Sequence, residues 1–209
     1  MLSFAVLGFM AFRLASGLRI SRTGAGRAVV RSVWQRLGWR HIWPIPFVLT
    51  VVIVVASLLI LVPGLDWGWW SMIGGEGNPV FGSSEATAGS VFEWLVPLAF
   101  MGMLLPALPL FANAEERIFR SGAEHWSSGR RVFKTLQFGM VHAIIGIPIG
   151  AALALSIGGA YFMRIYLREY ARTRSRAEAT IESTTAHAAY NGVIIVIVLI
   201  AVLFAAVAA

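Results

Sequence analysis

Four side chains suited to acid–base chemistry lie in or beside strongly apolar segments: Glu115, His142, His187 and Asn191. Ionisable and amide groups cost free energy at membrane depth, so they are candidates for a functional site. A carboxylate and an imidazole can activate water, while imidazole and amide N–H groups can stabilise an oxyanion. These residue types are therefore suited to hydrolysis.

The same side chains belong to three short motifs, each of which contains two residues four positions apart along the chain. Residues with this spacing share one face of an α-helix. The motifs are Glu115-Glu116-x-x-x-Arg120, Phe138-x-x-x-His142 and His187-x-x-x-Asn191. The spacing predicts that each motif presents its side chains together.

Each motif alone also has a purely structural interpretation. Glu116 and Arg120 could form an exposed ion pair at a helix end, worth only ~0.2–0.5 kcal/mol. His142 could be a core residue of an apolar helix. His187 and Asn191 could hydrogen-bond to a neighbouring helix, a contact worth about 0.6 kcal/mol on average in membranes. The order and common depth of the motifs favour the functional interpretation.

The composition is that of a membrane protein. Of the 209 residues, 58% are hydrophobic and 13% charged, which is too apolar for a soluble domain of this length. The chain lacks cysteine, which excludes disulfides and thiolate metal sites. We expect a single all-α, polytopic membrane domain over residues 1–209. Within it, 1–43 would be a short N-terminal helix with a basic interfacial segment, and 91–209 a helical core carrying the motifs.

The basic residues fall into three blocks, Arg13–Arg40, Arg117–Lys134 and Arg164–Arg176, and the formal net charge is +7. Beside membrane spans, such blocks indicate cytoplasmic segments attracted to anionic lipid rather than nucleic-acid binding. His41 and His125 lie near these blocks, and we expect both at the surface.

The positions of the basic blocks predict the membrane topology of the first half of the chain. Residues 44–64 form an uncharged span, and 91–113 a second span in which Pro97, Pro106 and Pro109 would cause kinks. The connecting loop, 65–90, has no Lys or Arg and should face outside. Residues 2–18 are either a short span or an interfacial helix, and 19–42 should lie on the lipid surface.

Residues 133–163 lie between two basic blocks, so both of their ends should be cytoplasmic. They are too long for one span and too short for two complete ones. Gly146-Ile147-Pro148 offers a break, which predicts two short or tilted helices, 133–146 and 147–170. One long kinked helix is the alternative. With a last helix over 178–207, the chain would have about five to six membrane helices, with the motif residues toward the cytoplasmic face.

Together, the three motifs over Glu115 to Asn191 resemble those of the CPBP (CAAX protease and bacteriocin-processing, or Abi) family of intramembrane proteases. The resemblance implies that Glu115 and His142 activate the attacking water, and that His187 and Asn191 form the oxyanion hole. It also implies supporting roles for Glu116, Arg120 and Phe138. The family is regarded as glutamate-dependent with no cofactor, although two histidines and a glutamate leave zinc open.

The chain departs from the family pattern in places. Family members often have glycine directly after the motif arginine, whereas Ser121 precedes Gly122 here. The N-terminal half is short, and the arginine run 164–176 is unusually dense. These departures affect the expected substrate pocket and leave the motifs intact.

The resemblance implies an intramembrane peptidase of the bacterial inner membrane, with lipid and a peptide or membrane protein as partners. The short chain and the basic blocks also fit a non-catalytic CPBP-like subunit of a larger membrane complex, or an immunity-type protein. An ion-coupled transporter is less favoured, because no inverted repeat is apparent.

Overall fold

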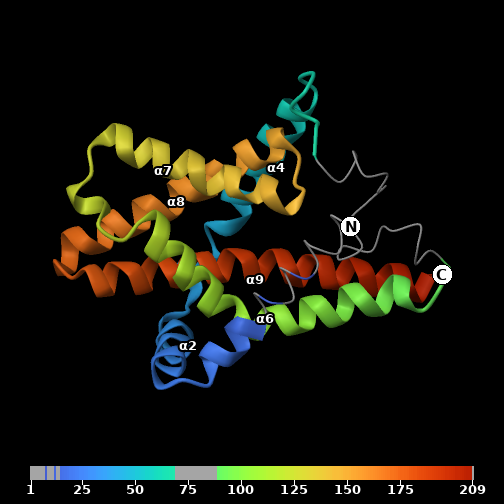
Figure 1. The fold of residues 1–209 in the computed structure, drawn as a ribbon, viewed down its shortest axis with the longest axis horizontal. Helices are drawn as coiled ribbons and strands as arrows, with labels where there is room; N and C mark the ends of the chain where they lie inside the picture. Colours follow the sequence, from blue (N-terminus) through green and yellow to red (C-terminus); the bar gives the residue numbers. More distant parts are fainter. Residues whose placement is uncertain (1–7, 9–11, 13–14, 69–88, 209) are drawn as a thin grey trace.

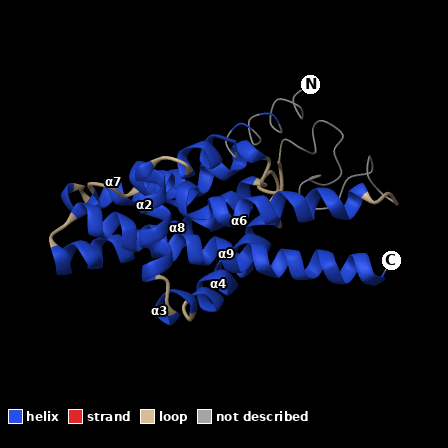
Figure 2. Ribbon diagram, turned by 90° about the horizontal axis from the view of Figure 1, so that it is seen from below, coloured by secondary structure: helices blue, strands red, loops and turns tan. Residues whose placement is uncertain are grey.

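The structure, a computed structural model, describes residues 8, 12, 15–68 and 89–208. All regular secondary structure in these ranges is helical, which confirms the all-α prediction (Figure 1, Figure 2). The elements are α2 (Gly24–Arg36), α3 (Trp39–Ile42), α4 (Ile45–Ile60), α6 (Phe92–Phe119), η2 (Ala123–His125), α7 (Ser128–Met140), η3 (Val141–Ile145), α8 (Ile149–Thr173) and α9 (Arg176–Ala208).

Three stretches of the described chain are helical, long and apolar enough to cross a membrane: Trp39–Ile60, Ile149–Thr173 and Arg176–Phe204. The chain is thus a candidate multi-pass membrane protein. The larger number of five to six membrane helices stays a prediction. Most of the segment 2–18 and of the loop 65–90 lies outside the described residues.

Helix α6 covers all but the first residue of the predicted span 91–113 and continues to Phe119, so it carries the first motif on its last turns. It remains helical through Pro97, Pro106 and Pro109, and Figure 1 shows it change direction partway along, as expected for internal prolines.

The predicted break at Gly146 is present. Gly146 has φ of +95°, a left-handed conformation that favours glycine, and Pro148 precedes the first residue of α8. Helix α7, continued by the 3-10 helix η3, therefore folds back against α8. The two helices approach closely at Gly139, where a Cβ atom would collide with the Ala152 carbonyl oxygen. The alternative of one long helix is wrong, and α7 begins at Ser128, earlier than predicted.

The turn between η3 and α8 lies beside the end of α4. The Ile149 and Gly150 N–H groups donate to the carbonyl oxygens of Trp67 and Leu65, at 3.0 Å and 2.7 Å. Helix α8 therefore begins where α4 ends and packs along it. Which side of the membrane each end of these helices faces stays a prediction.

Helix α9 is divided into two halves of different polarity. Its first half buries a run of polar side chains against the other helices, and its second half is apolar. The aromatic residues Phe119, Phe138 and Phe162 pack in a core cluster with Ala186, Ala189 and Tyr190 of this first half. The polar part of α9 thus lies at the centre of the fold.

Glu124 in η2 ties the loop after α6 to the corner between α8 and α9. It accepts hydrogen bonds from the Tyr166 hydroxyl at 2.8 Å and from the Arg176 guanidinium at 2.9 Å. Burial would raise the pKa of Glu124, but these hydrogen bonds outweigh it and hold the pKa below the ordinary 4.5.

A carboxyl with a lowered folded-state pKa stabilises the fold fully above its unfolded-state pKa, and this contribution is lost as the pH falls through the folded-state value. We therefore expect Glu124→Gln to melt below wild type near neutral pH, with the difference closing in acid. Thermal unfolding in detergent over a pH series measures this. A difference in melting temperature that stays constant down to the acid end of the series would contradict the assignment.

Candidate active site

The pair Glu116 and Arg120 is fully buried. Both side chains are 0% exposed, and Arg120 Nη1 donates to Glu116 Oε1 at 2.7 Å. The guanidinium also lies 4.1 Å from the centroid of the Phe138 ring and donates to the Gly159 carbonyl oxygen at 3.3 Å. The alternative of an exposed helix-end ion pair is therefore wrong, because α7 and α8 cover the end of α6.

His187 joins this pair from α9. Its Nδ1 lies 2.9 Å from Glu116 Oε1, and its ring stacks on Phe162 at a centroid distance of 4.4 Å. An ionised carboxylate only accepts hydrogen bonds, so Nδ1 carries the proton and donates. Glu116, Arg120 and His187 form what we call the buried ion cluster, and this cluster fixes the orientation of the His187 ring.

Glu115 lies on the other side of the same imidazole. Its Oε2 is 3.7 Å from His187 Nε2, longer than a direct hydrogen bond, and its side chain is 31% exposed. The Oε2 atom is buried and makes no hydrogen bond with the described residues. Two neighbouring carboxylates thus occupy different environments: Glu116 is sealed and paired, whereas Glu115 is partly open.

His142 lies in η3 and is anchored by the backbone of α7. Its Nδ1 is 2.9 Å from the Phe138 carbonyl oxygen and 3.2 Å from that of Gly139. A carbonyl oxygen only accepts, so Nδ1 carries the proton and Nε2 offers a lone pair. His142 and His187 both contact the Phe138 ring, at centroid distances of 5.3 Å and 5.4 Å. Both imidazoles therefore line the same aromatic wall.

The structure does not connect all four predicted side chains directly. Within the described residues, no hydrogen bond joins His142 to Glu115, and the half-buried Asn191 makes no side-chain hydrogen bond at all. Asn191 follows His187 by one turn of α9. The structure thus brings Glu115, Glu116, Arg120 and His187 together. It places His142 against the Phe138 ring, which also contacts Arg120 and His187.

His41 contradicts the sequence-based prediction. It was expected at the surface but is 3% exposed, because Glu182 of α9 lies 3.1 Å from its Nε2. His125 is exposed, as predicted, with 70% of its side chain accessible. The mistake over His41 arose because nothing in the local sequence shows that α9 covers α3.

Two further polar features near the cluster were not predicted from the sequence: the Tyr190 hydroxyl and the contact between Asn113 and Thr184. The hydroxyl of Tyr190 is buried without a hydrogen-bond partner in the described chain, and its ring packs against Phe162. Asn113 donates to the Thr184 hydroxyl at 3.2 Å, which links α6 to α9 one turn from the cluster. The Ser/Thr-rich run before His187 was the sequence signal for this polar packing.

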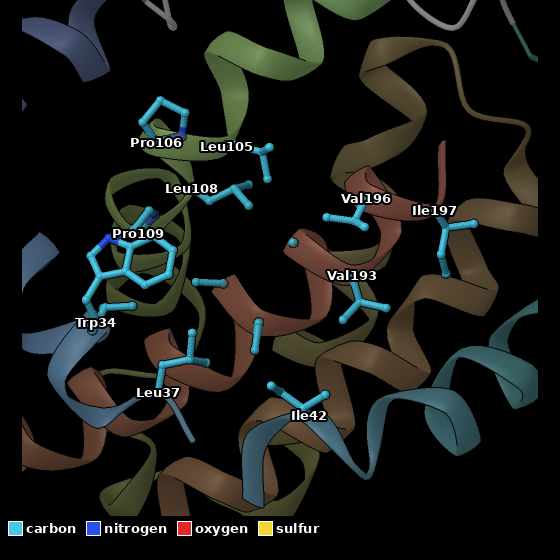
Figure 3. Close-up of a pocket in the computed structure, with 14 residues that line it drawn as sticks. Trp34, Leu37, Ile42, Leu105, Pro106, Leu108, Pro109, Val193, Val196 and Ile197 are labelled. Carbon is cyan, nitrogen blue, oxygen red and sulfur yellow. The ribbon is translucent and has the colours of Figure 1, made fainter. Parts of the chain in front are cut away.

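A large apolar groove lies on a different side of α9. It has a volume of about 530 Å³ and is formed by α2, α3, α6 and α9 (Figure 3). On α9 it is lined by residues that include Ala189 and Val196, which lie roughly opposite His187 at 3.6 residues per turn. The groove is therefore separate from the buried ion cluster.

Among the described residues, no three His, Asp or Glu side chains are grouped so that they could hold a metal ion. The donor set around His187 is its imidazole and the carboxylates of Glu115 and Glu116. Glu116 is already paired with the Arg120 guanidinium, so these three side chains are poorly suited to bind zinc.

No protein-family model, curated protein or solved structure matches the chain.

Proposed function

We propose that the chain is an intramembrane peptidase of the CPBP type that hydrolyses a peptide bond near the cytoplasmic face, with Glu115 as the general base. One observation carries the proposal. His187 lies between two adjacent carboxylates, with Nδ1 2.9 Å from the sealed Glu116 and Nε2 3.7 Å from the partly open Glu115. Two carboxylates with different environments are typical of a site in which they have different roles.

In the proposed reaction, Glu115 takes a proton from water, and His142 holds the water through Nε2. The water oxygen bonds to the peptide carbonyl carbon. Glu115 then passes the proton to the amine nitrogen as the C–N bond breaks. The free amide of Asn191 can donate to the oxyanion. His187 can do so only when Nε2 is also protonated, because its Nδ1–H already donates to Glu116.

Glu116 and Arg120 are positioning residues in this proposal. Their pairing holds the His187 ring, and the Phe138 face holds Arg120. Such supporting contacts keep reacting groups in a productive geometry without touching the substrate. The Phe138 ring contacts both His142 and His187, which gives a physical reason for an aromatic residue one turn before His142.

The proposed substrate class rests on the expected level of the site in the membrane. Glu115 is on the last turns of α6, close to the second basic block, and the chain has three candidate membrane spans. A peptide or membrane protein that reaches the cytoplasmic interface of a bacterial inner membrane would have access to this level. Leader peptides and membrane-protein segments are therefore the proposed substrates.

Mass spectrometry of newly formed protein N-termini tests the proposal without a known substrate. Membranes from cells expressing wild type, Glu115→Gln or neither would be compared. We expect a set of N-termini that appears only with wild type. Glu178→Gln is a matched control, because Glu178 pairs with Arg36 away from the cluster.

If wild type and Glu115→Gln yield the same N-termini, the peptidase assignment is wrong. The alternative then gains support: the buried ion cluster would serve only to pack α6 against α9 in a non-catalytic membrane subunit. Copurification of a stoichiometric partner, retained by Glu115→Gln, would be the positive sign of that function.

A further inference from the structure

A basic pocket lies between α3, with the turn that precedes α4, and the C-terminal half of α8. It is away from the buried ion cluster. Its volume is about 560 Å³. The charged side chains that line it, apart from His41, are Arg40, Arg164, Arg168, Arg172, Glu169 and Glu182. Neither the proposed hydrolysis nor the helix packing described above uses the arginines of α8.

The two carboxylates in this pocket are already paired. Glu182 binds His41 and Arg40, both at 3.1 Å. Glu169 accepts two hydrogen bonds from Arg172, at 2.6 Å and 3.0 Å.

Arg164 and Arg168 have no acidic partner of this kind. They are exposed and make no ion pair or side-chain hydrogen bond with the described part of the chain. The pocket therefore has an excess of positive charge that no acidic side chain of the described chain neutralises.

Four arginines line this pocket, three of them from α8. Arg164, Arg168 and Arg172 follow each other at intervals of four on α8, so they share one face of the helix. Arg40, on α3, lines the same pocket. Guanidinium groups bind phosphate oxygens through paired N–H donors, which makes several arginines around one hollow a fitting phosphate site.

The expected position of the pocket relative to the lipid headgroups indicates which phosphate groups can reach it. Trp43 and Pro44 at the pocket wall immediately precede α4, and Trp43 is 52% exposed. Exposed tryptophans at the end of a membrane helix mark the interface with lipid headgroups. Basic pockets between membrane helices on the cytoplasmic side are suited to anionic headgroups.

We propose that this pocket binds a phosphate group at the level of the lipid headgroups, with Arg164 and Arg168 as the principal ligands. The phosphate of an anionic phospholipid and free phosphate share this chemistry. The proposal does not depend on the peptidase assignment, because none of its residues belongs to the buried ion cluster.

The test measures binding to the purified full chain in neutral detergent. The probes are phosphatidylglycerol, phosphatidylcholine and inorganic phosphate, and retained lipid is detected by native mass spectrometry. We expect wild type to prefer phosphatidylglycerol to phosphatidylcholine. Arg164→Gln/Arg168→Gln should weaken phosphatidylglycerol binding by about tenfold or more, because two charge-assisted contacts are lost.

The matched control is Arg19→Gln/Arg31→Gln, which removes the same charge from exposed arginines elsewhere. Loss of inorganic phosphate binding in parallel would identify a free phosphate as a sufficient ligand. Loss of phosphatidylglycerol alone would identify the lipid.

The proposal would be overturned if both double variants lost phosphatidylglycerol binding equally or if neither lost it. It would also be overturned if wild type showed no preference between the two lipid headgroups. Thermal unfolding of each variant confirms that a loss of binding is not a loss of fold.

Discussion

Arg120→Met is expected to be the most destabilising single change in the described fold, lowering the free energy of unfolding by about 3–5 kcal/mol. The substitution roughly preserves volume but removes the cation from a site in which Arg120 and Glu116 are both 0% exposed. The Glu116 carboxylate would remain buried without the cation that now neutralises it. The change would also remove the contact of the guanidinium with the Phe138 ring.

The double variant Arg120→Met/Glu116→Gln separates charge from packing. Removing both charges should recover part of the lost stability, because no uncompensated buried ion remains. Arg172→Met is the control, since its side chain is 71% exposed and its pairing with Glu169 is screened by water. Unfolding in detergent, followed by tryptophan fluorescence, measures all three. Equal stability of Arg120→Met and Arg172→Met would show that the buried ion cluster does not hold the helices together.

Glu115→Gln should lower kcat by about 10²–10⁴, the range for loss of a positioned general base. Glutamine has nearly the same shape but cannot take a proton. In the wild type, Glu115 Oε2 makes no hydrogen bond with the described residues. Replacing this oxygen therefore removes no hydrogen bond to those residues. We therefore expect the melting temperature to stay close to that of wild type while cleavage of a substrate peptide is lost.

His142→Ala should give a similar loss of cleavage, because the imidazole Nε2 is proposed to hold the same water. Glu178→Gln, which changes a half-exposed carboxylate on α9, should cleave at the wild-type rate. An intact rate in both Glu115→Gln and His142→Ala would remove the basis for the proposed chemistry.

The sequence predicted those features that depend on local chemistry. The helical class follows from the apolar runs, and the break before α8 follows from a glycine and a proline two positions apart. The four-residue spacing put Glu116 and Arg120 on one face of α6, and they do contact each other. These predictions succeeded because backbone geometry and helix period are set by neighbouring residues.

The burial of each charged group could not be predicted in the same way. Glu115 and Glu116 are adjacent and chemically identical, yet only Glu116 is sealed, because α9 and the α7–α8 hairpin cover its side of α6. His41 was misplaced for the same reason, since its partner Glu182 is far along the chain. Such contacts depend on how whole helices pack, and a single sequence carries no direct record of that packing.

The most direct test of the account is cleavage by the purified protein in water enriched in oxygen-18. A peptide that spans a junction found by N-terminal mass spectrometry would serve as substrate, with Glu115→Gln run in parallel. The account predicts one oxygen-18 atom in the new carboxyl terminus with wild type, and no product with Glu115→Gln. Equal cleavage by both proteins, or none by wild type above a protein-free control, would contradict it.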